Sequence, residues 1–207
     1  MANTMFLGLV YATLLLQLVI TFGIVYKFHD NEKLAQIYKR HRLIFFLITL
    51  GLILALVFIP LHPALKLLLF TLFAVAFGFS LLSLTAPFPT KAIHLALFSV
   101  FLVFIGTSIL GLILTQMGYK LMAWIPFLLA ALIAVIITEV VLLFIPPSSK
   151  VFHALLVIIV ILFSIFNVVD TNMILQKDYY GDYIQGAIDF YLNFINLFSA
   201  IFGLQNE

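Results

Sequence analysis

The sequence of 207 residues contains no cysteine, and only 9% of its residues are charged. The lack of cysteine excludes disulfides and thiolate metal sites. A soluble domain has about 25% charged residues, so this chain, which is 65% hydrophobic, cannot hide its apolar surface from water. The formal charge of +2 is too small to indicate nucleic-acid binding. These shortages leave lipid as the solvent of most of the chain.

Long apolar runs take the place of the missing charges. A membrane-spanning helix requires about 20 apolar residues, and seven runs come close to or exceed that length: 6–26, 43–59, 67–86, 93–114, 122–145, 152–175 and 184–204. Prolines 60, 63, 87, 89, 146 and 147 mark points where helices should end. The runs exceed the length of a membrane strand and do not alternate, which argues against a β-barrel. We therefore predict an all-α integral membrane protein, a seven-helix transmembrane bundle forming a single domain over residues 1–207.

The polar segment 27–42, between the first two predicted spans, carries five of the ten Lys and Arg residues of the chain. We expect it to lie in water or among lipid headgroups. Because loops rich in Lys and Arg remain on the cytoplasmic side, this segment favours a cytoplasmic loop and an N-terminus outside.

Three carboxylic acids lie within the predicted spans: Glu139 in the fifth, Asp170 in the sixth and Asp189 in the seventh. An acid at the centre of a bilayer costs about 2.5–3.5 kcal/mol, so it usually faces the interior of the bundle or a water-filled cavity and marks a functional site. We expect Glu139 to face the bundle interior or a water-filled cavity on this ground.

Polar residues form a stripe on each of the last two predicted helices. In the last helix Asp189, Asn193 and Asn196 follow each other at steps of four and three, which places them on one face. The preceding helix carries a matching stripe: Ser164, Asn167, Asp170 and Thr171. We predict that the two stripes face each other, with Asp170 in hydrogen-bonding reach of Asn193 or Asp189. Alternatively, such residues serve only as hydrogen bonds between helices.

If the bundle encloses a pore, four of these polar residues are the candidates to line it: Glu139, Asn167, Thr171 and Asn196.

Three segments resemble the motifs of the transmembrane Bax inhibitor motif family. LFSIFNVVDTNMI, residues 162–174, is similar to L-F-x-x-x-x-x-x-D-T-x-x-I, and AIDFYLNFINLF, residues 187–198, is similar to A-L-x-L-Y-L-D-x-I-N-L-F. FLGLVYATLLLQLVIT, residues 6–21, resembles the opening F-L-x-x-V-Y-x-x-L-x-x-Q-L-x-x-T. The three motifs occur in order and span the whole chain, and the last two are the specific ones.

The resemblance implies a seven-helix fold with the C-terminal helix near the centre. It also implies a calcium leak that responds to pH and, in eukaryotic members, suppression of cell death. In that family the aspartates of D-T and of Y-L-D form a pair. Two close carboxylates share a proton and can act as a pH switch.

The sequence departs from the family pattern at this pair. Asp170 matches the first carboxylate, whereas Asn193 occupies the position of the second. Asp189 lies one turn earlier on the same face and could replace the missing carboxylate. The resemblance thus implies an ion- and pH-sensing site made of Asp170, Asp189 and Asn193.

Three functions compete. The first is a pH-sensitive calcium or cation leak channel that serves ion homeostasis and cell survival. The second is an intramembrane aspartyl protease, but such enzymes require a glycine directly before the aspartate and Ile188 stands there, so we expect no enzyme. The third is a non-conducting protein that regulates a membrane protease or a death regulator.

The expected partners are membrane lipid, calcium ions and, under the third hypothesis, other membrane proteins, but not nucleic acid. We expect no cofactor, with Ca²⁺ only as a permeant ion. The protein should be a multi-pass protein of a bacterial inner membrane or of the eukaryotic ER or Golgi. The resemblance implies an N-terminus in the cytoplasm, the opposite of what the charge distribution favours.

Overall fold

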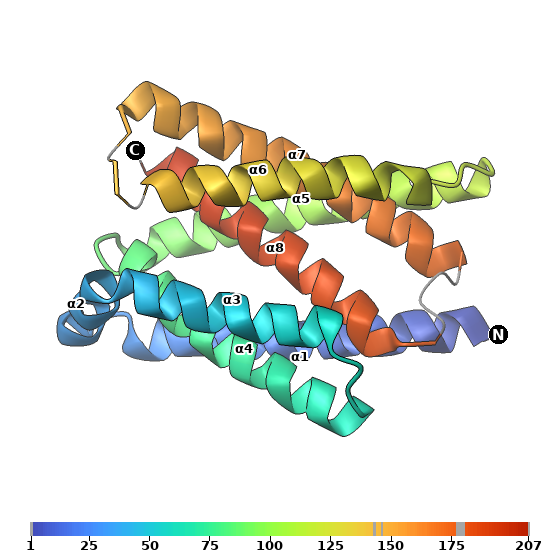
Figure 1. Ribbon diagram of the computed structural model, residues 1–207, viewed down its shortest axis with the longest axis horizontal. Helices are drawn as coiled ribbons and strands as arrows, with labels where there is room; N and C mark the ends of the chain where they lie inside the picture. Colours follow the sequence, from blue (N-terminus) through green and yellow to red (C-terminus); the bar gives the residue numbers. More distant parts are fainter. Residues whose placement is uncertain (1, 143, 146, 177–180, 207) are drawn as a thin grey trace. The chain divides into compact units, whose positions relative to one another are not determined.

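The computed structural model describes residues 2–142, 144–145, 147–176 and 181–206, and all regular elements in these ranges are helices. They are eight α-helices and a short 3₁₀-helix, and Figure 1 labels the α-helices. They are α1 (Ala2–Phe28), α2 (Glu32–Arg40), α3 (Arg42–Phe58), α4 (Pro63–Thr85), α5 (Thr90–Gln116), η1 (Met122–Trp124), α6 (Ile125–Leu142), α7 (Ser149–Gln176) and α8 (Tyr183–Gln205). The prediction of an all-α membrane protein is confirmed.

Six helical segments are long and apolar enough to cross a membrane: Met5–Phe28, Pro63–Thr85, Thr90–Gln116, Met122–Leu142, Ser149–Gln176 and Tyr183–Gln205. The seventh predicted span corresponds to α3, which has 17 residues. It follows α2 at an angle of 79°, so α2 and α3 can count together as one broken span. The number of spans is therefore six, or seven with this bent pair.

The starts and ends of several helices differ from the predicted ones. Pro63, expected to close the second span, instead begins α4, where a proline at the first position loses no hydrogen bond. His62 precedes it and its Nδ1 accepts a hydrogen bond from the Ala64 amide at 3.3 Å. The fifth span opens with η1, and α6 ends at Leu142. Residues 143, 146 and 177–180 lie outside the described residues, and the last of these ranges is half of the segment 176–183 between the last two predicted spans.

The polar segment after the first span contains a helix that the sequence pattern did not predict. The side chain of Asn31 caps α2 by accepting a hydrogen bond from the Leu34 amide at 3.1 Å. The helix buries no residue completely. Tyr38 nevertheless stacks on Phe79 of α4, with ring centroids 5.5 Å apart, so the segment is ordered against the protein.

The chain divides into two compact units, and the residues of α8 belong to both of them. The first unit comprises Met1–Ile93 and Asp182–Tyr191. Within it α4 packs mainly against α1 and α3, which lie beside it in Figure 1. Gly78 brings α4 close to α1, because a Cβ at this position would lie 2.8 Å from the Thr21 carbonyl oxygen.

The second unit comprises His94–Gly181 and Leu192–Glu207. In this unit Gly111 allows a close approach of α5 to α7, since an added Cβ would lie 2.6 Å from the Val168 carbonyl oxygen. The C-terminal part of α8 contacts α5 through the rings of Phe194 and Phe104, whose centroids are 5.6 Å apart.

The C-terminal helix is the most enclosed of the candidate spans. Of its most apolar stretch 67% is buried, against 44% for α7 and 11–33% for the other four. A place of this helix at the centre of the other six stays a prediction.

The contact at Gly111 predicts a position-specific effect of alanine. We expect Gly111→Ala to destabilise the protein by about 1–3 kcal/mol, because the new methyl group must displace the α7 backbone. Gly106 lies on the same helix, and a Cβ added there would meet nothing within 4 Å, so Gly106→Ala is the matched control and should be neutral or slightly stabilising. Unfolding free energies in mixed micelles measure both. Equal effects of the two changes would contradict the close contact.

Candidate functional site

The buried carboxylate of Asp170 is held by the amide of Asn193. Asn193 Nδ2 of α8 donates a hydrogen bond to Asp170 Oδ2 of α7 at 2.7 Å. Asp170 is 5% exposed and Asn193 is 3% exposed. The prediction that Asp170 lies in hydrogen-bonding reach of Asn193 or Asp189 is confirmed for Asn193. Because the amide is the donor here, the interaction does not require a proton on the carboxylate.

The stripe of the sixth predicted span does not face α8 as a whole, which corrects the prediction. Asn167 is fully buried and points to α5, where its Nδ2 lies 2.9 Å from the Phe104 carbonyl oxygen and 2.7 Å from Thr107 Oγ1. Residues three apart on a helix differ by about 60° in direction. One turn of α7 can therefore present Asn167 to α5 and Asp170 to α8.

Thr171 and Asn196 make hydrogen bonds within their own helices. Thr171 Oγ1 donates to the Asn167 carbonyl oxygen at 2.7 Å, and Asn196 Nδ2 donates to the Leu192 carbonyl oxygen at 2.7 Å. Such bonds satisfy a polar side chain at bilayer depth without a partner helix. Pore lining by Asn167, Thr171 and Asn196 stays a prediction.

Glu139 is exposed on α6, so the expectation that it faces the interior is wrong, whereas the alternative of a water-filled cavity stays a prediction. The helix ends at Leu142, so Glu139 lies within its last turn. From the end of a span, a carboxylate can extend to the headgroup region, and the cost of facing lipid is largely avoided. The expected reason for burying this residue therefore does not apply.

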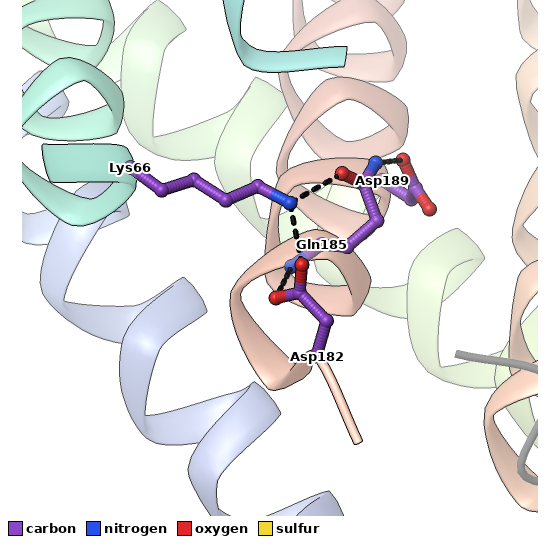
Figure 2. A network of polar contacts seen from close by, with 4 residues as sticks. All are labelled: Lys66, Asp182, Gln185 and Asp189. Atoms are coloured by element: carbon purple, nitrogen blue, oxygen red, sulfur yellow. Dashed lines mark hydrogen bonds and ion pairs between the residues drawn. The ribbon is translucent and has the colours of Figure 1, made fainter. Parts of the chain in front are cut away.

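A second polar cluster lies within the first unit and was not predicted from the sequence. Lys66 of α4 forms an ion pair with Asp182, with 2.6 Å between Nζ and Oδ2, and Nζ also donates to Gln185 Oε1 at 2.8 Å. Gln185 Nε2 in turn donates to Asp189 Oδ1 at 3.0 Å. Figure 2 shows Lys66 reaching from α4 to Asp182 and Gln185 at the start of α8, with Asp189 joined to Gln185. Asp189, expected to partner Asp170, is thus bonded to Gln185; its substitution for the missing carboxylate stays a prediction.

The local sequence contains a signal for this cluster. Lys66 is in the first turns of α4, where the helix dipole disfavours a positive charge. Asp182 directly precedes α8. Its Oδ1 accepts a hydrogen bond from the backbone N–H of Gln185 at 2.9 Å, as the side chain of an N-cap residue does. Lys66 flanked by leucines at the start of a span is thus compatible with an acidic partner, although a lysine in this place can also extend to water.

Residues of the opening and closing motifs meet inside the first unit. The hydroxyl of Tyr191 is 2.6 Å from Thr21 Oγ1 of α1, and both residues are fully buried. Gln17, one turn before Thr21, donates through Nε2 to Thr71 Oγ1 of α4 at 3.1 Å. These contacts give the motif residues of the first span a packing role around the start of α8.

In the second unit, Asn172 fixes the connection after α5. Its Oδ1 accepts from the Leu121 amide at 3.0 Å, and its Nδ2 donates to the Tyr119 carbonyl oxygen at 2.9 Å. This connection contains Gly118 with φ +83°, a conformation that favours glycine. The arrangement is a structural one, since it satisfies backbone groups of the turn.

The described residues contain no group of three or more His, Cys, Asp or Glu side chains that could hold a metal ion.

Comparison with known proteins assigns the chain to a family. The sequence model of a protein family described as "Inhibitor of apoptosis-promoting Bax1" matches residues 3–206. A search of curated proteins found no match.

The Asp170–Asn193 hydrogen bond predicts a difference between two asparagines of α8. Asn193→Leu should lower the unfolding free energy by about 1–2 kcal/mol, because it leaves a buried carboxylate without its amide donor. Asn196→Leu is the matched control, and we expect a change within about 0.5 kcal/mol, because its amide bonds only to its own helix. Unfolding in mixed micelles measures both, and an equal loss would refute a specific role of Asn193.

Proposed function

Because the chain belongs to the family of inhibitors of apoptosis-promoting Bax1, we propose that it is a calcium-permeable cation leak whose activity depends on pH. Its apolar helices and its family identify it as a multi-pass integral membrane protein. The proposal goes further and assigns to Asp170 the role of the ion- and pH-sensing group, with Asn193 as its partner. Such a leak serves ion homeostasis and, in a eukaryotic host, cell survival.

The observation that carries the proposal is the buried carboxylate of Asp170. It lies within α7, is 5% exposed, and accepts a hydrogen bond from the neighbouring helix. Keeping an acid within a span is costly, and such residues usually mark the path of an ion or proton. Carboxylate and amide oxygens are also the ligands that Ca²⁺ prefers. The proposal concerns a passing ion, which must bind weakly enough to leave again.

The amide at position 193 determines the expected response to pH. Two carboxylates in contact share a proton and release it over a narrow pH range. An asparagine supplies no second carboxylate, and its N–H donates to Asp170 Oδ2 without requiring a proton on that side chain. We therefore expect a weaker dependence on pH than in a relative with two carboxylates.

The same amide favours a second candidate function. A carboxylate that is satisfied by an amide can be a fixed contact between α7 and α8 without any role in transport. The protein would then be a non-conducting partner that regulates a membrane protease or a death regulator. Flux through the purified protein separates the two functions.

Calcium flux in proteoliposomes between about pH 5 and 8 tests the proposal. The wild type should conduct with a shallow pH dependence, and Asn193→Asp should make it steeper, with flux falling as the new pair takes up its shared proton at lower pH. Asp170→Asn keeps the shape of the side chain but removes its charge, so we expect flux to fall about tenfold and the pH response to disappear.

Asn206→Asp is the control, because it adds a carboxylate just after the end of α8, 13 residues beyond Asn193. It should leave the pH profile of the wild type unchanged. Wild-type flux no greater than that of empty liposomes would reject the leak in favour of the interaction protein. A steep pH response of the wild type that survives Asp170→Asn would reject the role given to Asp170.

A further inference from the structure

Lys66 is the one lysine among the buried polar residues of the described chain. Its side chain is 11% exposed, whereas that of its partner Asp182 is 42% exposed. The ammonium therefore lies below a carboxylate that water can reach. A buried ammonium group such as that of Lys66 requires its polar partners, because removal of a partner leaves the buried positive charge uncompensated.

Gln185 connects this ammonium to a second carboxylate. Its Oε1 accepts from Lys66 Nζ, which fixes the orientation of the amide, and its Nε2 then donates to Asp189 Oδ1. A reversed amide would place an NH₂ group against an ammonium and an oxygen against a carboxylate. Lys66 thus acts on Asp182 directly and on Asp189 through one oriented amide, as the dashed contacts in Figure 2 show.

The two partners of Lys66, Asp182 and Gln185, lie in one row with Asp189, the partner of Gln185. Asp182, Gln185 and Asp189 are separated by steps of three and four residues, which align them along the helix over about 10 Å. The row leads from an exposed carboxylate before the helix to a half-buried one two turns inside it. A hydrated cation entering along this row would meet carboxylates, and it would also meet the ammonium of Lys66.

We propose that Lys66 sets the cation selectivity and the rate of the leak, as a tethered positive charge that competes with permeant cations for the row on α8. The inference rests on the function proposed above. Its physical consequence depends on ion charge, because the repulsion of a divalent cation by one ammonium is twice that of a monovalent cation. If removal of the charge raises K⁺ flux by a given factor, it should raise Ca²⁺ flux by about the square of that factor.

Flux of Ca²⁺ and of K⁺ in proteoliposomes tests the inference with Lys66→Gln and Lys66→Met. Both variants remove the charge, and the glutamine retains a polar contact with Gln185 in case the methionine protein does not fold. We expect K⁺ flux to rise roughly threefold and Ca²⁺ flux roughly tenfold. Lys66→Arg keeps the charge and should retain the wild-type ratio. Lys120→Met removes an exposed lysine of the other unit and is the matched control.

The outcomes separate this inference from the proposed function. If the wild type conducts Ca²⁺ and neither neutral variant raises the ratio of Ca²⁺ to K⁺ flux, the role of Lys66 is rejected and the leak stands. An equal rise for both ions also rejects it, because this indicates a loosened structure. If only the neutral variants conduct, the wild type is not a leak but the role of Lys66 as a charge barrier is supported. If no variant conducts, both proposals fail.

Discussion

A carboxylate inside a membrane-spanning helix must find its hydrogen-bond donors within the protein, because lipid offers none. Asp170 meets this requirement through Asn193, and the bond joins α7 to α8. The small residue at Gly111 supports the same helix from its other side, since it lets α5 approach the backbone of α7. The neighbourhood of one buried acid thus determines which faces of α5, α7 and α8 pack together in the second unit.

The polar clusters around Asp170 and around Lys66 differ in the charges that they contain. At Asp170 a buried side-chain oxygen accepts a hydrogen bond from a neutral amide on the neighbouring helix. Around Lys66 an ammonium faces a carboxylate directly and a second one through Gln185. In the leak that we propose, the first cluster would attract a cation and the second would oppose its entry.

Composition and the lengths of the apolar runs were enough to predict the helical membrane fold, since few other structures satisfy their backbone in lipid. The spacing of Asp170 and Asn193 on their helices was enough to predict their contact. The direction in which each polar side chain points around its helix was harder to predict. Asn167 bonds to α5 and not to α8, because its side chain is rotated by about 60° from that of Asp170, three residues later. Helix ends were also beyond the sequence pattern, which did not indicate that Glu139 lies in the last turn of α6. Lys66 was missed because it stands at the edge of an apolar run, where a lysine usually reaches water.

The central claim is that Asn193 stabilises the ionised side chain of Asp170 inside the protein. A double-mutant cycle on the unfolding free energy measures this directly, with Asp170→Ala, Asn193→Ala and the double variant in the same micelles. The account predicts a coupling energy of about 1–2 kcal/mol between the two positions. Additive effects, with a coupling below about 0.3 kcal/mol, would contradict it.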